Sequence, residues 1–331
     1  MENPANNGPL IFCIYIIYIM IIKKVNNSKV KDLNFSNPYT FPTYSHTTQD
    51  NSMILALIAG VRNAGKTTVA LNIIELEKKH LLEGDAKVYF ISPTRDAKVD
   101  YFIEKYPDNF EYYDELSREN MENVLNKIKE RVENWKQKYE LLKLLKQYLT
   151  NPKKLTFEEM ELLEEMDYLQ DDEELEKFRY EHPCLSTLII DDSIGCDMIC
   201  EARSIQGKWF QKFALKHRHF PYYCNIFILT QHIKSCCKYF RTNANWTILF
   251  PFRDHNVLKS VFDEYSILFD NNIDNFLKFM EDIRLKNDHS FCSIYYDKIQ
   301  YIRRGFNEEI DFKIPKAPDI FCAKVEFIDE K

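Results

Sequence analysis

The stretch Leu55-Ala-Leu-Ile-Ala-Gly60-Val-Arg-Asn-Ala-Gly65-Lys66-Thr67-Thr68 decides the fold of this chain. An apolar run leads into the pattern G-x-x-x-x-G-K-T, and a helical pattern continues from Val69 to Leu82. A glycine-rich loop between a strand and a helix binds phosphate. Glycine lets the backbone close around the anion, and the amino end of the helix attracts negative charge. The stretch therefore predicts a phosphate-binding loop, and two of only seven glycines falling in register argue against a chance match.

The loop pattern assigns roles to single residues. Lys66 is expected to reach the β- and γ-phosphates of a nucleotide, and the Thr67 hydroxyl is expected to hold Mg²⁺. Arg62 either touches phosphate or faces solvent. The predicted cofactors are therefore ATP and Mg²⁺, and the predicted nucleotide-binding residues are Gly60, Val61, Arg62, Asn63, Ala64, Gly65, Lys66, Thr67 and Thr68.

Length and composition narrow the class of protein. A chain of 331 residues can form one large α/β domain with an insertion, or two small domains. The net charge of −7 gives no global basic surface for nucleic acid, although residues 201–250 carry eight Lys and Arg against one acid. Nine irregularly spaced cysteines indicate a reduced, intracellular protein. Four cysteines could be imagined as zinc ligands, namely Cys196, Cys200, Cys236 and Cys237. The sequence has no paired C-x-x-C motifs to support such a site.

The amino-terminal part of the chain differs from the rest. Residues 10–22 are thirteen apolar residues followed by two lysines. A membrane span needs about 20 residues, and a signal peptide carries its charge before the apolar run. Three interpretations stay open: a short anchor on a membrane surface, an arm that packs on a partner, and a misplaced start codon. Residues 25–50 are polar and predict a linker, so residues 1–50 are expected to precede the core.

Strand and helix patterns alternate from residue 51 onward. Alternation of this kind predicts an α/β fold with a mostly parallel sheet and helices on both faces. Buried strands are expected at 53–59, 87–91, 109–113, 184–190, 224–229 and 246–250. A carboxyl-terminal β-hairpin is expected between residues 291 and 303. The ATPase domain should thus span residues 51–310, with a tail at 311–331.

One segment interrupts this alternation. Apolar residues recur at three- and four-residue steps from Met121 to Leu149, which predicts a long amphipathic helix. The Asn151-Pro152 pair ends the pattern, and Thr156 with Glu159 predicts the capping box of a second helix. We interpret residues 115–180 as a helical insertion in the sheet domain.

Three polar residues follow two of the predicted strands. Asp191 and Asp192 come after the strand at 184–190, and Gln231 comes after the strand at 224–229. The carboxyl ends of parallel strands share one edge of a sheet, where the phosphate loop also lies. Asp191 is expected to hold Mg²⁺ with Thr67, and Asp192 to orient or activate a water molecule. Gln231 is expected to bond that water or the γ-phosphate. The alternative is that these residues only cap turns.

Two arginines in the basic segment are candidates for catalysis between subunits. Arg218 and Arg241 could each act as an arginine finger on a neighbouring subunit, although most exposed arginines have no such role. The basic segment also suits loops that track a phosphate backbone without reading bases.

Six motifs occur in a fixed order along the chain. They are the phosphate loop, I-S-P-T at Ile91–Thr94, L-I-I-D-D before Ser193, K-H-R-H-F at Lys216–Phe220, L-T-Q at Leu229–Gln231 and F-R-T-N-A-N at Phe240–Asn245. This order resembles the genome-packaging ATPases of large DNA viruses, the poxvirus-type branch of the FtsK–HerA superfamily. The resemblance covers residues 53–305 without the insertion. The insertion is larger than the family pattern, and the apolar amino terminus has no counterpart in it.

The resemblance implies more than the single motifs do. It implies an ASCE/RecA-like P-loop NTPase that forms a homo-oligomeric ring and pulls double-stranded DNA into a capsid. It makes Asp192 the catalytic acid and Gln231 the γ-phosphate sensor. It also implies a capsid or portal-vertex partner and a location in the virion or a viral factory in the host cytoplasm. From the residues alone, a small-molecule kinase and a nucleotide-gated assembly scaffold stay open as alternatives.

Overall fold

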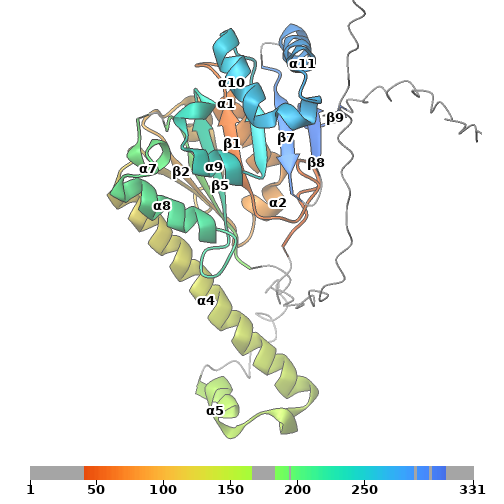
Figure 1. Ribbon diagram of the computed structural model, residues 1–331. Coiled ribbons are helices and arrows are strands. Elements are labelled where there is room, and N and C mark those ends of the chain that lie inside the picture. Colours follow the sequence, from red (N-terminus) through yellow and green to blue (C-terminus); the bar gives the residue numbers. More distant parts are fainter. Residues whose placement is uncertain (1–40, 166–182, 194, 287–288, 298–299, 311–331) are drawn as a thin grey trace, which may run out of the picture. The chain divides into compact units, whose positions relative to one another are not determined.

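The computed structural model describes residues 41–165, 183–193, 195–286, 289–297 and 300–310 (Figure 1). The expectations for residues 10–22, for the linker up to residue 40, for residues 166–180 of the insertion and for the tail at 311–331 lie outside these residues. Among the helices of the described ranges, none has both the length and the apolarity needed to cross a membrane.

The described part of the chain forms one nine-stranded sheet in the order β3-β2-β4-β5-β1-β6-β7-β8-β9. The first six strands pair in parallel, and β7, β8 and β9 add an antiparallel edge. The prediction of a mostly parallel sheet with a carboxyl-terminal hairpin is therefore confirmed. The strands are β1 (Leu55–Ala59), β2 (Lys87–Ile91), β3 (Phe110–Tyr113), β4 (Ser186–Ile190), β5 (Cys224–Thr230), β6 (Trp246–Leu249), β7 (Cys292–Tyr296), β8 (Gln300–Arg304) and β9 (Glu308–Glu309).

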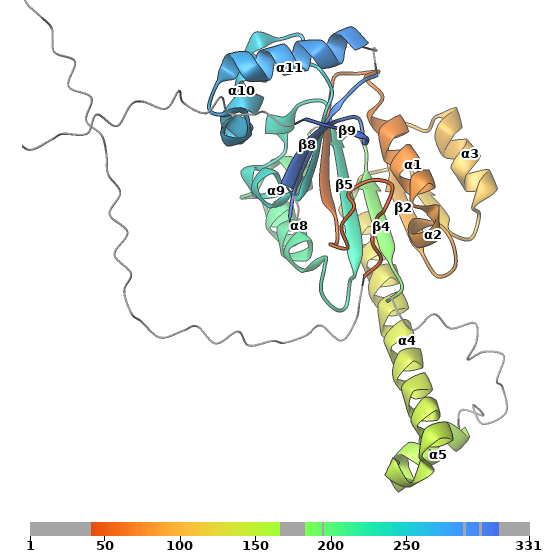
Figure 2. The same ribbon diagram turned by 90° about the vertical axis from the view of Figure 1, so that its right-hand side faces the viewer.

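Helices cover both faces of the sheet, as Figure 2 shows. Side chains alternate along β1, so Ala56 and Ile58 pack against α1 and α3, whereas Leu55 and Leu57 pack against α4, α8 and α9. The helices α10 and α11 cover the antiparallel edge. The helices are α1 (Lys66–Leu76), α2 (Lys78–Leu81), α3 (Ala97–Lys105), α4 (Arg118–Thr150), α5 (Phe157–Glu165), α7 (Asp197–Cys200), α8 (Ile205–Lys216), α9 (Lys238–Asn243), α10 (His255–Tyr265) and α11 (Ile273–Lys286), with 3₁₀ turns at Pro152–Lys154, Ile233–Ser235 and Ser266–Phe269.

The predicted long helix is α4, and only part of it touches the sheet. Its first turns pack on the sheet face through Met121, Val124, Leu125 and Ile128. The distal residues Leu142 and Leu145 instead contact Leu163 of α5. The predicted capping box is present, because the Glu159 N–H donates to Thr156 Oγ1 at 3.2 Å and the Thr156 N–H donates to Glu159 Oε2 at 2.8 Å.

Residues 44–50, which we expected to belong to a linker, pack against the domain. Tyr44 is fully buried, and its hydroxyl accepts a hydrogen bond of 3.0 Å from the side-chain amide of Asn225. Thr47 Oγ1 donates to the buried carboxylate of Glu77 at 2.9 Å. The polar composition of this stretch concealed its burial, because the polar groups of Tyr44 and Thr47 find partners inside the protein.

Candidate nucleotide-binding site

The phosphate loop has the backbone shape that its sequence predicts. Gly65 adopts φ 107°, in the left-handed region that favours glycine, and it ends the loop at the first residue of α1. No side chain caps the amino end of α1. The first N–H groups of the helix are therefore free to bind an anion.

Gly60 is needed for a different reason. A Cβ atom at this position would lie 2.7 Å from Cβ of Phe250, which is closer than two carbon atoms pack. Phe250 follows β6 and also lies beside Gly65. Nδ1 of His289 also lies beside the loop, 3.1 Å from the Ala64 carbonyl oxygen. Our sequence analysis did not predict either neighbour as part of the site.

Lys66 is folded back onto its own loop. Its ammonium group donates to the carbonyl oxygens of Gly60 at 3.0 Å and Val61 at 3.2 Å. Burial lowers the pKa of Lys66, and the carboxylates of Asp191 and Asp192 oppose this shift. The lysine thus lies across the loop, where a phosphate group would compete with two neutral carbonyls for it.

The predicted metal ligands meet across the sheet edge. Thr67 Oγ1 donates a hydrogen bond of 2.6 Å to Oδ2 of Asp191, a residue 124 positions away in the sequence. Asp191 is only 8% exposed, and its burial raises its pKa against the effect of the Thr67 hydrogen bond. A hydroxyl and a buried carboxylate that face each other are the oxygen ligands Mg²⁺ prefers. The two residues therefore fit a magnesium site.

The other two predicted residues also meet. Gln231 Nε2 donates to Oδ1 of Asp192 at 3.2 Å. Asp192 has φ 52°, a left-handed conformation that is uncommon outside glycine, and its N–H donates to Asp191 Oδ1 at 2.8 Å. The strained backbone turns the two adjacent carboxylates of Asp191 and Asp192 toward different partners.

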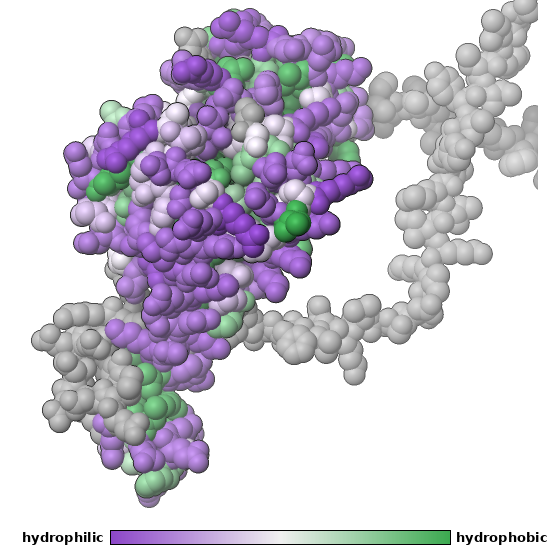
Figure 3. Space-filling view, turned by 90° about the vertical axis from the view of Figure 1, so that its left-hand side faces the viewer, coloured by the Kyte–Doolittle hydropathy of each residue, from purple (hydrophilic) through white to green (hydrophobic). Residues whose placement is uncertain are grey.

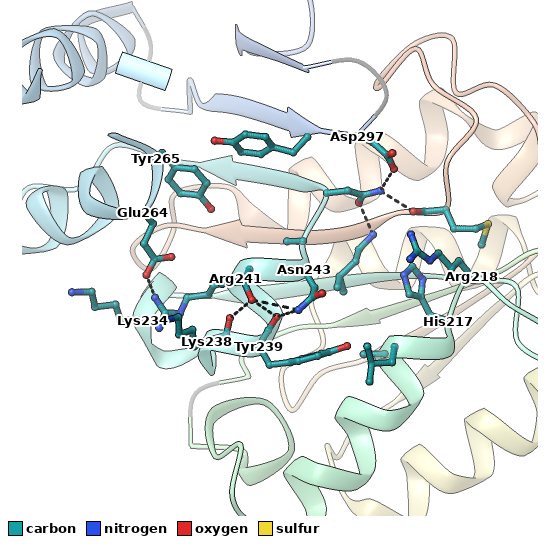
Figure 4. Close-up of a pocket in the computed structure, with 18 of the residues that line it drawn as sticks. His217, Arg218, Lys234, Lys238, Tyr239, Arg241, Asn243, Glu264, Tyr265 and Asp297 are labelled. Carbon is teal, nitrogen blue, oxygen red and sulfur yellow. Dashed lines mark hydrogen bonds and ion pairs between the residues drawn. The ribbon is translucent and has the colours of Figure 1, made fainter. Parts of the chain in front are cut away.

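The two arginine candidates lie away from the phosphate loop of their own chain. Both line a cavity of about 930 Å³ that extends from Leu55 at the start of β1 and Asn245 just before β6 to Lys234, which follows β5 (Figure 4). Arg241 is ion-paired with Glu264, and its Nε donates to the Cys236 carbonyl at 3.0 Å. Arg218 is exposed at the same cavity.

Two residues of the family-like motifs have structural roles. The side chain of Asn245 accepts from the Leu55 N–H at 2.8 Å and donates to the Met53 carbonyl at 2.9 Å, which aligns β6 with β1. His217 is buried, with Nδ1 at 2.7 Å from the Cys224 carbonyl oxygen. Burial lowers the pKa of His217 to about 4.

The cysteines of the described ranges are free thiols. Within these ranges, no group of three or more His, Cys, Asp or Glu side chains is arranged to hold a metal ion.

The protonation of His217 gives a direct test of the burial of its side chain. We expect its imidazole to titrate near pH 4 in an NMR titration, with the resonance identified by a His217→Gln variant. Because the folded protein favours the neutral ring, the residue contributes stability above about pH 6.5, and this contribution is lost as the pH falls toward 4. A midpoint near 6.5 would contradict the burial of the ring.

Comparisons with known proteins were made at three levels. No protein-family model matches the chain. No curated protein matches it in sequence. Among solved structures, it is similar to the genome packaging NTPase B204 from Sulfolobus turreted icosahedral virus 2 in complex with ATP-gammaS. The identity is 13%, the match covers 76% of this chain and 96% of that chain, and the TM-score is 0.42.

Two further solved structures are similar over much of the chain. The pCW3 conjugation coupling protein TcpA with ATPgS is 14% identical over 78% of this chain and 61% of its own, with a TM-score of 0.37. The cytoplasmic domain of the Thermomonospora curvata Type VII secretion ATPase EccC is 8% identical over 76% of this chain and 25% of its own, with a TM-score of 0.38. The match therefore covers less than two thirds of the length of each of these two proteins.

At these identities and TM-scores, the similarities say nothing about individual residues. The topology of the chain itself describes the fold, a mostly parallel sheet in which β5 lies between the loop strand β1 and the acid-bearing strand β4. With a phosphate-binding loop between β1 and α1, this is the fold of a P-loop NTPase. The structural neighbours include a viral genome-packaging NTPase, the kind of protein that the sequence motifs resemble.

Proposed function

We propose that this chain is an ATP-driven motor that translocates double-stranded DNA, and that it packages a viral genome into a capsid. The observation that carries the proposal is the hydrogen bond between Thr67 and Asp191 at the edge where Gln231 meets Asp192. These contacts bring together the phosphate loop and the two residue pairs that we propose hold the metal ion and orient the water. Similarity to a genome packaging NTPase and the order of the sequence motifs support the choice of substrate.

ATP would bind with its phosphates against the uncapped amino end of α1. Lys66 would exchange its two carbonyl partners, Gly60 and Val61, for the β- and γ-phosphates, which attract its charge more strongly. Mg²⁺ would be held by Thr67 and Asp191, and it would neutralise charge that develops on the transferred phosphoryl group. The buried position of Asp191 strengthens this electrostatic interaction.

Asp192 and Gln231 would act on the attacking water. The carboxylate of Asp192 accepts a hydrogen bond from the water and takes up its proton as it attacks the γ-phosphorus atom. The Gln231 amide, which is bonded to Asp192 here, would instead donate to the γ-phosphate. The exchange of this one hydrogen bond would report whether the γ-phosphate is present.

The arginine that completes the site would come from a second copy of the chain. Arg218 and Arg241 both line a cavity that contains no residue of their own phosphate loop, and we propose that in a ring with head-to-tail contacts they face the neighbour's nucleotide. Arg241 already forms an ion pair with Glu264, whereas Arg218 is exposed. We therefore assign Arg218 as the trans-acting residue. We further propose a capsid or portal-vertex partner and a location in the virion or in a viral factory of the host cytoplasm.

ATP turnover with and without duplex DNA tests the proposed function. Duplex DNA should stimulate turnover, and Lys66→Ala should lower it at least about a hundredfold with an unchanged circular dichroism spectrum, because the charge on the phosphates is left unneutralised. Lys98→Ala, at an exposed lysine on α3, is the matched control.

Three results would contradict the motor. Normal turnover in Lys66→Ala would remove the phosphate loop from the mechanism. Turnover that requires a small-molecule acceptor would indicate a kinase. Nucleotide binding without turnover would indicate an assembly scaffold.

Mixing two inactive variants tests the trans-acting arginine. We expect Arg218→Ala and Lys66→Ala each to be inactive alone. In a 1:1 mixture, a quarter of the interfaces would pair an intact loop with an intact Arg218, so turnover should return to about a quarter of the wild-type rate if subunits act independently. An inactive mixture, under conditions where the variants co-assemble, would contradict an arginine supplied in trans.

A further inference from the structure

A row of lysines runs along the exposed side of α8. Lys208, Lys212 and Lys216 are spaced four residues apart, so each lies about 6 Å further along the same side of the helix than the one before. The opposite side of α8 is buried through Phe210 and Phe213, which pack on the sheet. The packing therefore fixes the direction in which the lysines point.

This row is not an ordinary solvated helix face. On α4, two exposed cations have acidic partners on the same helix: Arg118 pairs with Glu122 at 2.8 Å and Lys143 with Glu140 at 3.8 Å. By contrast, the sequence has no acidic residue between Glu201 and Asp254, and none of the three α8 lysines forms an ion pair with a residue in the described ranges. Among the described residues, no ion pair therefore offsets the positive charge of the row.

Further cations lie near the row. A groove of about 280 Å³ between α4 and α8 is lined by Lys129, Lys212 and Lys216, and its one carboxylate, Glu122, is paired with Arg118. Beyond the carboxyl end of α8, the large cavity is lined by the cations Arg218, Lys234, Lys238 and Arg241 and by the acids Asp263, Glu264 and Asp297. The side of the domain that carries α7 and α8 in Figure 1 is mostly hydrophilic in Figure 3.

We propose that Lys208, Lys212 and Lys216 bind the phosphate backbone of double-stranded DNA, an assignment that rests on the proposed function. Duplex DNA carries one negative charge per about 1.7 Å of its axis, so an uncompensated row of cations finds phosphates in any register and with any sequence. Charge complementarity thus favours a partner that is polyanionic and uniform.

The aromatic residues beside the row favour a duplex over a single strand. Proteins that hold single strands stack the bases on open aromatic faces. Here the Arg118 guanidinium lies 5.8 Å from the ring centre of Trp209, and the Lys129 ammonium lies 5.6 Å from the ring centre of Tyr222. Cations already lie over these rings, so the rings are not open for bases to stack on. The surface therefore suits contact with the phosphate backbone of a duplex.

The chain connects this surface to the nucleotide site. In the sequence, residues 193–204 connect Asp192 to the first residue of α8. Within that link, the Ile199 carbonyl accepts a hydrogen bond of 2.9 Å from the N–H of Cys237, in the segment that follows Gln231. The segment that leads into the lysine row therefore follows Asp192 and contacts the segment that follows Gln231, the two residues proposed to act on the attacking water.

Salt-dependent binding to a short DNA duplex of mixed sequence tests the assignment, with fluorescence anisotropy as the readout. The test variant replaces Lys208, Lys212 and Lys216 with Gln. The control variant replaces Lys98, Lys259 and Lys278 with Gln, which removes the same charge from exposed positions on α3, α10 and α11. We expect the slope of log affinity against log salt to become shallower by about 2.7 in the test variant and to stay unchanged in the control, because each lost phosphate contact removes about 0.9.

Further readouts separate this surface from the nucleotide site. The test variant should keep the ATP turnover that the wild type shows without DNA, and replacing the three lysines by Arg should preserve the slope. The assignment is overturned if the test variant binds duplex DNA like the wild type, if both variants lose the same slope, or if single strands outcompete the duplex. If the wild-type chain does not bind duplex DNA at all, the proposed function itself fails.

Discussion

The hydrogen bond from Thr67 to Asp191 is the contact on which the site depends. It joins the first turn of α1 to the end of β4, although another strand, β5, separates β4 from the loop strand β1. A contact of 2.6 Å across this distance in sequence forms only if all three strands are parallel and end at the same edge. Any shift of register would move Thr67 or Asp191 away from the other.

The carboxyl end of β5 holds the two functional loops in place. The Gly60 N–H donates to the Thr230 carbonyl at 3.1 Å, which fixes the start of the phosphate loop. The Ser193 hydroxyl donates to the Leu229 carbonyl at 3.1 Å, which fixes the residue after the acidic pair. Gln231 continues from the same strand toward Asp192. One buried strand therefore positions the loop, the acids and the glutamine together.

The meeting of these residues at one edge of the sheet could be expected from the sequence because it depends on local patterns. Walker-type spacing identifies Lys66 and Thr67, and fully apolar strands that end in Asp191 or Gln231 bring those residues to one edge. Other residues depend on partners that no local pattern reveals. Phe250 and His289 reach the loop from distant segments, and His217 in a basic motif is a buried, neutral side chain. The helix α9 is short and polar, so its sequence has no periodicity to predict it.

A structure of the protein bound to Mg²⁺ and a non-hydrolysable ATP analogue is the most direct measurement of the central claim. It should show the phosphates against the amino end of α1, Lys66 released from the Gly60 carbonyl, and the metal ion between Thr67 and Asp191. A nucleotide bound elsewhere, or a metal ion that contacts neither Thr67 nor Asp191, would contradict the account.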